Sequence, residues 1–350
     1  MLKGLTIKNL TVFSEAQIDF SPKLNVVVGM NGTGKSHLLK VAYSLSAVLA
    51  EGRRKFKGEA PSKKYLQMAI AEKLVGVFRP ENLGRLTRRR QGRARCDISL
   101  RFTNSSCDLS CGFASNSKTE VSVEKAPLSW SDTEPLFFPT RELMSLYPNF
   151  VSTYERHYLE FEETWRDTCL LLGTPLMKGP RNAFMRGILD PLEKGMSGKL
   201  IVSDGRFYIQ KKDGKMEIHL VAEGHRKLAM VAHLVASGGL RKNSCLFWDE
   251  PEANLNPRLV KLIVKTTLNL CKYGVQVFMA THDLFLLREL ALQKNAYKKL
   301  PVRFIGLHGE ESGVVVEQGD SIDDIEHLVS LDENVDQSNR YLSEDWQEES

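Results

Sequence analysis

Short apolar runs and amphipathic segments succeed one another at both ends of the chain. Near the N-terminus, LTIKNLTVF and AQIDF are typical of strands, and the continuous apolar run LNVVV is typical of a strand buried on both faces. The segment 38–49 then carries apolar residues at helical spacing. Past residue 222, helices and apolar strands alternate as far as PVRFIGLH and GVVVEQ. This order predicts an α/β fold with a mostly parallel sheet flanked by helices.

The middle of the chain interrupts this order. CDISLRF and TEVSVEK predict a hairpin joined by a polar stretch, and the segment from Thr140 to Ser197 is mostly helical in pattern. A three-stranded meander follows, with Asp-Gly turns at 204–205 and 213–214. We therefore predict a division into a split core at 1–50 and 198–318, an insertion at 51–197 (basic loop, hairpin and helical subdomain), and an acidic C-terminal tail at 319–350.

A glycine-rich loop joins the LNVVV strand to the first helix. Its sequence, GMNGTGKS, fits the pattern G-x-x-x-x-G-K-[ST] of a P-loop, in the required strand–loop–helix context. The glycines let backbone amides approach phosphate oxygens, and the helix N-terminus adds its positive end. The lysine reaches the β- and γ-phosphates, and the serine hydroxyl ligates Mg²⁺. We expect ATP to be bound by Gly29, Asn31, Gly32, Thr33, Gly34, Lys35, Ser36 and His37.

Two later apolar strands end in residues that suit phosphate chemistry. CLFWDE ends in Asp249, which we expect to hold Mg²⁺ together with Ser36, and in Glu250, placed to polarise the attacking water. VQVFMATHD leads to His282, at the carboxyl end of a strand, where α/β sheets bind ligands. Taken alone, each of these motifs is also typical of a strand end whose polar residues are simply solvated. Together with the P-loop they predict Lys35, Glu250 and His282 as catalytic residues.

Charge is distributed unevenly along the chain, although the net charge is only +5. Residues 51–95 carry 14 Lys and Arg against 4 Asp and Glu, whereas residues 317–350 carry 12 acidic residues against one base, Arg340. The basic region is about equally typical of a surface that binds nucleic-acid phosphates, of a solvated loop, and of a surface that binds an acidic partner. Its cations are Arg53, Arg54, Lys55, Lys57, Arg85, Arg88, Arg89, Arg90, Arg93 and Arg95. The acidic tail is typical of a flexible terminus.

Composition places few further limits on function. No apolar run approaches the length of a membrane span, and the N-terminus lacks the pattern of a signal peptide. The six cysteines are scattered along the chain and do not supply the two closely spaced pairs that a zinc site requires. We expect a cytoplasmic protein with reduced thiols and no membrane partner.

The order of these motifs resembles the ABC-type ATPases of the SMC/RecF group. The opening through GMNGTGKS and the segment DEPEANLNP carry the resemblance, and LFFPTRELMSLYPNFVSTYERHYLEFEETW is similar to compact bacterial ATPases grouped with OLD proteins and anti-phage cassettes. The resemblance implies an ABC-type ATPase head with a mixed sheet. It also implies a homodimer that encloses two ATP molecules between its nucleotide sites.

The resemblance places the ABC signature loop at 221–225. There Gly224 is expected to contact the nucleotide of the opposite subunit. Ala222 stands where such families usually have serine, and Glu223 where glycine is usual, which suggests slow hydrolysis. Asn256 replaces the usual aspartate of the D-loop. The segment 140–142 is the candidate Q-loop.

These features support three functional hypotheses. The leading one is an ATP-hydrolysing dimer that switches a separate effector protein, as the ATPase or sensor component of a bacterial anti-phage system. The second is an ATP-regulated scaffold that sequesters an effector with little hydrolysis. The third is a DNA repair or recombination ATPase, which the basic region supports.

Overall fold

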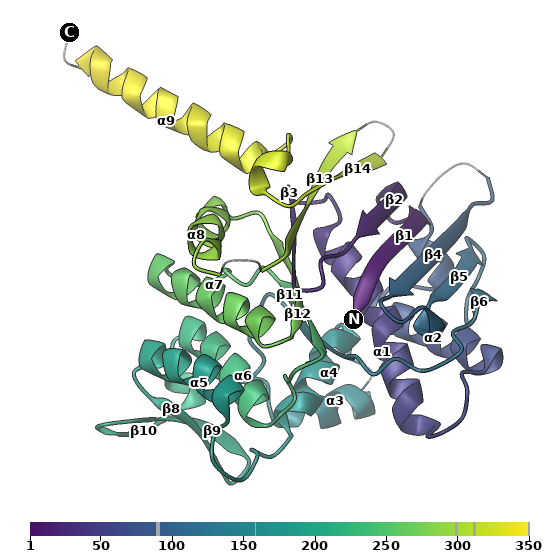
Figure 1. Cartoon of the computed structure of the whole chain (residues 1–350), viewed down its shortest axis with the longest axis horizontal. Helices are drawn as coiled ribbons and strands as arrows, with labels where there is room; N and C mark the ends of the chain where they lie inside the picture. The colour runs from purple at the N-terminus through teal and green to yellow at the C-terminus, as the bar shows by residue number, and fades with distance from the viewer. Residues whose placement is uncertain (89–91, 158, 298–299, 311–312, 349–350) are drawn as a thin grey trace.

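A computed structural model of the chain describes residues 1–88, 92–157, 159–297, 300–310 and 313–348. Its central element is a six-stranded mixed sheet with the order β14-β13-β3-β12-β11-β7 (Figure 1). All neighbouring pairs are parallel except β13 with β14. In sheet order, the strands are Gly313–Gly319, Val302–Glu310, Leu24–Gly29, Gln276–Thr281, Ser244–Asp249 and Glu134–Phe138. The predicted α/β class is confirmed.

The second sheet is antiparallel and has the order β2-β1-β4-β5-β6. Its strands, in that order, are Phe13–Asp19, Leu2–Leu10, Arg95–Phe102, Leu109–Ala114 and Ser122–Lys125. The predicted hairpin of CDISLRF with TEVSVEK is wrong, because β5 lies between the two segments. Leu109, Cys111 and Phe113 alternate inward on β5 within a stretch whose serines and asparagines suggested a loop.

A three-stranded meander, β10-β9-β8, forms the third sheet. Its strands are β8 Lys199–Ser203, β9 Arg206–Lys211 and β10 Gly214–Glu217. The predicted Asp-Gly turns are confirmed, since Asp204, Gly205 and Gly214 all have positive φ angles.

Helices cover both faces of the central sheet (Figure 1). Because side chains alternate along β3, Val27 faces a core shared with α1 and the antiparallel sheet, whereas Val26 and Val28 face a core shared with α5–α8. The helices are α1 Lys35–Lys55, α2 Lys63–Phe78, α3 Asn149–His157, α4 Glu163–Leu172, α5 Ala183–Met196, α6 Glu223–Ala236, α7 Pro257–Lys272, α8 Leu284–Lys294 and α9 Val329–Glu348. Single 3-10 turns span Leu83–Leu86, Ser105–Cys107, Ile218–Leu220 and Ile322–Asp324.

Both large sheets take strands from either side of the predicted boundaries. β7 comes from the predicted insertion and forms an edge of the central sheet, and β4–β6 extend the sheet of β1 and β2. The division into a split core and an insertion therefore does not correspond to separate sheets, and its boundaries stay a prediction. Part of the predicted basic loop is helical, since α1 continues to Lys55 and α2 begins at Lys63.

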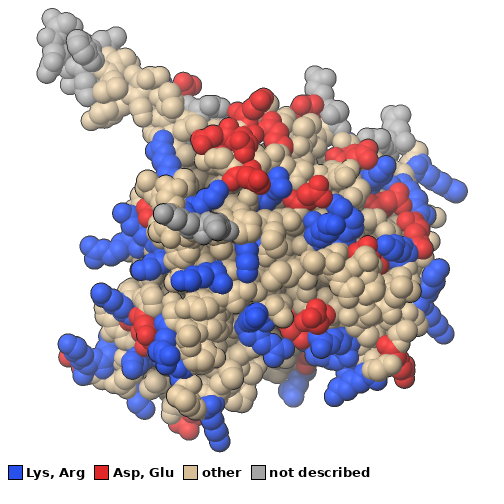
Figure 2. Space-filling view, in the orientation of Figure 1, with Lys and Arg blue, Asp and Glu red and all other residues tan. Residues whose placement is uncertain are grey.

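The acidic tail is a helix rather than the expected irregular terminus. α9 projects away from the body of the molecule (Figure 1), and acidic side chains gather around its base (Figure 2). Among the described residues, no helix combines the length and apolarity needed to cross a membrane. The six cysteines are buried and unpaired, as expected for reduced thiols.

Candidate functional site

Three strand ends meet at one edge of the central sheet. β12 lies between β3 and β11 and is parallel to both, with Thr281 opposite Val28 and Asp249 opposite Ala280. The P-loop after β3, the acidic pair at the end of β11 and the histidine after β12 therefore lie side by side. The sequence prediction that the motifs meet at the carboxyl ends of parallel strands agrees with this register.

The P-loop holds its lysine inward. Gly32 and Gly34 have φ angles of 82° and 92°, which favour glycine, and a Cβ on Gly34 would lie 2.6 Å from the Val12 side chain. The Lys35 Nζ donates to the carbonyls of Gly29 at 2.7 Å and of Met30 at 2.9 Å. Burial lowers the pKa of Lys35, and the nearby acids oppose that shift. The loop thus presents a partly desolvated cation at its centre.

Asp249 and Ser36 form a donor set that fits Mg²⁺. Asp249 is buried, and its Oδ1 has no hydrogen-bond partner among the described residues. Burial raises the pKa of Asp249, and hydrogen bonding by Ser36 opposes the rise. A carboxylate oxygen beside a hydroxyl at a P-loop is the oxygen set that Mg²⁺ takes in such sites. We propose that these two side chains hold the ion.

Glu250 and His282 face each other beside this set. Glu250 Oε1 lies 3.3 Å from His282 Nδ1, with 28% of the Glu250 side chain and 48% of the His282 side chain exposed. Glu250 has a φ of 44°, and its amide donates to the Ala280 carbonyl at 2.9 Å. This left-handed turn points the carboxylate away from the strand, within reach of water. The predicted catalytic pair is therefore brought together, and its roles remain our proposal.

Two buried charged residues that no sequence motif indicated also lie at this site. The Lys227 side chain on α6 is fully buried, and its Nζ donates to the Ala253 carbonyl at 2.8 Å. Glu252 accepts a 2.6 Å hydrogen bond from the Thr281 hydroxyl, and its Oε2 has no partner among the described residues. Together they hold residues 250–253, the loop that carries Glu250. Lys227 is detectable in the sequence because it lies on the same helical face as Val231.

The predicted signature loop packs against the segment that follows Glu250. Glu223 accepts a 2.9 Å hydrogen bond from Asn254, so its charge is partnered within the chain. A Cβ on Gly224 would lie 2.9 Å from the end of the Leu259 side chain, so the loop packs closely against α7 at this position. Asn256 is the N-cap of α7, a position where asparagine and aspartate are nearly equivalent. The expected contact of Gly224 with a second subunit's nucleotide stays a prediction.

Two other predicted residues have partners inside the protein. His37 Nδ1 lies 3.0 Å from the Thr11 hydroxyl, and burial followed by the charge of Lys40 lowers the pKa of His37. Glu142, in the candidate Q-loop, accepts a 2.6 Å hydrogen bond from Arg226 at the start of α6. Their contacts with nucleotide stay predictions, as do those of Asn31 and Thr33 in the P-loop.

The predicted basic region is not one free patch. Arg54 pairs with Glu134, Arg85 with Glu81, and Arg95 with both Asp97 and Glu124. Arg89 and Arg90 lie outside the described residues. A nucleic-acid surface in this region therefore stays a prediction.

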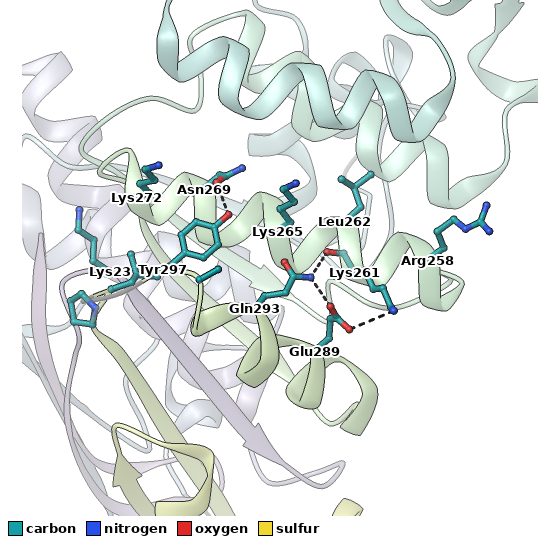
Figure 3. Close-up of a pocket in the computed structure, with 13 residues that line it drawn as sticks. Lys23, Arg258, Lys261, Leu262, Lys265, Asn269, Lys272, Glu289, Gln293 and Tyr297 are labelled. Carbon is teal, nitrogen blue, oxygen red and sulfur yellow. Dashed lines mark hydrogen bonds and ion pairs between the residues drawn. The ribbon is translucent and has the colours of Figure 1, made fainter.

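Other cations line a groove along α7, formed with α8 (Figure 3). Its volume is about 1140 Å³. Tyr297 closes one side and donates a 2.7 Å hydrogen bond to Asn269, and Glu289 is the single acid among the described residues that line the groove. Its cations are Lys23, Arg258, Lys261, Lys265 and Lys272. None of the described residues that line the groove belongs to the P-loop, and no motif in the sequence marks the groove.

The buried Glu252 predicts a specific pH dependence of stability. Burial raises the pKa of Glu252 from 4.5 to about 7, so the folded chain binds more protons than the unfolded chain between these values. The contribution of Glu252 to the free energy of unfolding should therefore fall as pH rises from 4.5 to 7. Glu252→Gln should flatten this slope and raise the free energy of unfolding at pH 8 by about 1–3 kcal/mol. Urea unfolding at several pH values checks this, and a slope equal to that of the exposed control Glu333→Gln would contradict it.

Lys227 predicts a loss of stability that depends on its hydrogen bonds. Lys227→Met keeps the length of the side chain but leaves the Ala253 carbonyl buried without a donor, which should lower the free energy of unfolding by about 1–3 kcal/mol. The matched change at the exposed Lys265 should have little effect. Equal stability of the two variants in chemical denaturation would show that Lys227 does not support the loop.

Models of AAA-domain families match two stretches of the chain. Residues 4–105 match the family model described as "AAA domain", and residues 123–288 match "AAA domain, putative AbiEii toxin, Type IV TA system". The chain is 40% identical over 45 residues to the DNA replication and repair protein RecF of Streptococcus agalactiae serotype Ia. It is 44% identical over 46 residues to RecF of Phocaeicola vulgatus. Each match spans 13% of this chain and only 12% of the RecF protein.

Solved structures share the fold at low sequence identity. An SMC head bound to the C-terminal winged-helix domain of ScpA has a TM-score of 0.55 at 13% identity, covering 92% of this chain and 98% of that one. An Smc head with an extended coiled coil, bound to the C-terminal domain of ScpA derived from Pyrococcus furiosus, has a TM-score of 0.51 at 12% identity, covering 98% of each chain. The chain is thus similar to AAA domains over these two stretches and shares the fold of SMC heads, which supports the predicted SMC/RecF-like, ABC-type ATPase fold.

Proposed function

We propose that the chain binds ATP with Mg²⁺ and hydrolyses it slowly, as a dimer that encloses two nucleotides. The observation that carries this proposal is the placement of Glu250 and His282 side by side at the sheet edge that holds the P-loop. Lys35 binds the phosphates, and bound Mg²⁺ supplies neutralisation of their charge. Glu250 polarises the attacking water, and His282 holds the Glu250 carboxylate and faces the γ-phosphate.

The proposed dimer is supported by two features of the single chain. Glu250 and His282 remain accessible at the surface, and α6 begins at the predicted signature loop without a side-chain cap. A free helix N-terminus is a favourable site for a phosphate, here one carried by a second subunit. Because Ala222 offers no hydroxyl, this contact consists of backbone amides alone, which supports slow hydrolysis.

The proposed output is a switch in a separate effector. One matching family model is named for a putative toxin of a type IV toxin–antitoxin system, which supports a place in a two-component bacterial system such as an anti-phage cassette. The SMC heads of similar fold are bound to ScpA, so this fold accommodates a protein partner. A scaffold that sequesters its effector with little hydrolysis would bind it stoichiometrically whether or not ATP is present. A switch would bind it in one nucleotide state only.

Glu250→Gln tests this proposal. Removing the base should lower ATP turnover by about 100-fold or more while leaving ATP binding intact, because Lys35 and the P-loop are unchanged. With Mg²⁺ and saturating ATP, the variant should accumulate as a dimer in light scattering, whereas the control Glu333→Gln should turn over like the wild type. A Glu250→Gln chain that binds ATP but stays monomeric would exclude the dimer.

The α7 groove favours a second candidate function, nucleic-acid binding in repair. Arg258, Lys261, Lys265 and Lys272 recur on one face of α7 and together span about 21 Å at 1.5 Å per residue (Figure 3). A row of exposed cations with one acid is suited to a phosphate backbone. The short RecF match is consistent with this alternative. The groove replaces residues 53–95 as the better-supported surface.

Charge reversal tests the α7 groove as a DNA-binding surface. The double change Lys261→Glu and Lys265→Glu should weaken binding of duplex DNA by about tenfold or more at low salt, and should reduce the salt dependence of binding. The control is Lys212→Glu with Lys215→Glu in the meander, which changes the net charge equally. Fluorescence anisotropy measures both. Equal affinities of the two double variants would exclude the groove as a DNA site.

A further inference from the structure

Two histidines and a glutamate converge where the chain leaves the central sheet for α9. His308 lies on β13, Glu317 on β14, and His327 in the linker that precedes α9. Their ligand atoms all lie within 4.8 Å of one another. Both imidazoles present Nδ1 to the same oxygen, Glu317 Oε1, His308 at 3.5 Å and His327 within hydrogen-bonding distance. The rings stack with their centroids 4.1 Å apart.

The fold explains why these three residues meet. Gly306 pairs with Glu317 across the antiparallel ladder, so His308 and Glu317 are diagonal neighbours on one face of the hairpin. A Cβ on Gly306 would lie 2.5 Å from the Ile325 side chain, so glycine lets the linker pass close to the sheet. Glu317 Oε2 then accepts a 2.9 Å hydrogen bond from the Glu326 amide. The linker is thereby held with His327 over His308.

The proton positions leave a place for a cation. Glu310 Oε1 lies 3.4 Å from His308 Nε2. With the imidazole proton on Nε2, where it faces this carboxylate, Nδ1 carries a lone pair. That Nδ1 is buried and has no hydrogen-bond partner among the described residues. Two lone-pair atoms, His308 Nδ1 and Glu317 Oε1, thus face each other. A carboxylate on the second nitrogen of a ligating histidine is the usual arrangement at metal sites.

We propose that His308 Nδ1, His327 Nδ1 and Glu317 Oε1 bind a divalent transition-metal ion of the zinc class. Two imidazoles and one carboxylate, with a fourth position open to water, match a known zinc ligand set. Tetrahedral zinc with bonds near 2.1 Å places ligand atoms about 3.4 Å apart, close to the 3.5 Å between His308 Nδ1 and Glu317 Oε1. Glu310 orients His308 and is a positioning residue.

The surroundings favour a cation at this position. Figure 2 shows acidic side chains gathered on the face around the base of α9. Glu310 lies 3.4 Å from His308, and the segment between β14 and α9 adds Asp320, Asp323, Asp324 and Glu326. A bound ion would cross-link the linker to the β13–β14 hairpin and so fix the base of α9. The neighbouring Leu307 pairs with Gly29 of the P-loop, which places the ion close to the nucleotide edge of the sheet.

Metal binding to the full chain, treated with chelator and free of nucleotide, tests this proposal. Zn²⁺ should bind in calorimetry with one site per chain, and Co²⁺ should give visible absorption without a thiolate charge-transfer band, because the cysteines are buried elsewhere. His327→Ala, at an exposed position, should raise the Zn²⁺ dissociation constant at least about 100-fold, and Glu310→Gln about tenfold. The control His219→Ala, an exposed histidine on another surface, should bind like the wild type.

Hydrogen exchange gives a second readout. In the wild type, Zn²⁺ should slow the hydrogen exchange of the amides at 321–328. In His327→Ala, Zn²⁺ should not change the exchange rate of these amides. Equal Zn²⁺ affinity in His327→Ala and His219→Ala, or no binding by the wild type, would overturn the proposal. Linker protection that changes with pH but not with Zn²⁺ would also overturn it, because the three residues would then form only a protonated histidine–glutamate contact.

Discussion

The parallel pairing of β11, β12 and β3 is the constraint on which the candidate site depends. Three strands with the same direction and a fixed register carry their C-terminal residues to one edge of the sheet, although the end of β3 is more than 200 positions in sequence from the ends of β11 and β12. A slip of one residue in β12 would turn His282 to the opposite face and separate it from Glu250. These strands are apolar and buried on both faces, as expected for parallel strands covered by helices on either side of the sheet.

The loop that carries Glu250 is held in place by buried charged side chains, whose burial opposes folding. Residues 250–254 have two left-handed non-glycine positions, Glu250 and Asn254, and no regular hydrogen-bond ladder to support them. Lys227 supplies the donors that this loop lacks, and Glu252 ties it to Thr281. Burial lowers the pKa of Lys227 to about 8 and raises that of Glu252 to about 7, so both charges oppose folding near neutral pH. The loop is stable only because these charged groups also make the hydrogen bonds.

The sequence predicted those elements whose signal lies within a short stretch of neighbouring residues. The P-loop, the acidic pair and the Asp-Gly turns were identified because each needs particular residues at fixed spacing. β5 was missed because its three inward residues lie among serines, and the helix α9 was missed because acidic composition outweighed its spacing of apolar residues. The ion pairs of Arg54 and Arg95, the α7 groove, and the cluster of His308 with Glu317 and His327 depend on tertiary contacts. Such contacts leave no pattern in a single sequence.

The central claim is that Asp249 and Ser36 join the P-loop in one Mg²⁺–ATP site. The most direct test measures ATP affinity with and without Mg²⁺ for the wild type and for Asp249→Asn, which keeps the shape of the buried side chain but removes its charge. We predict that Mg²⁺ strengthens ATP binding to the wild type and has much less effect on the variant. The same Mg²⁺ dependence in both proteins would contradict the account, because the carboxylate at the end of β11 would then lie outside the site.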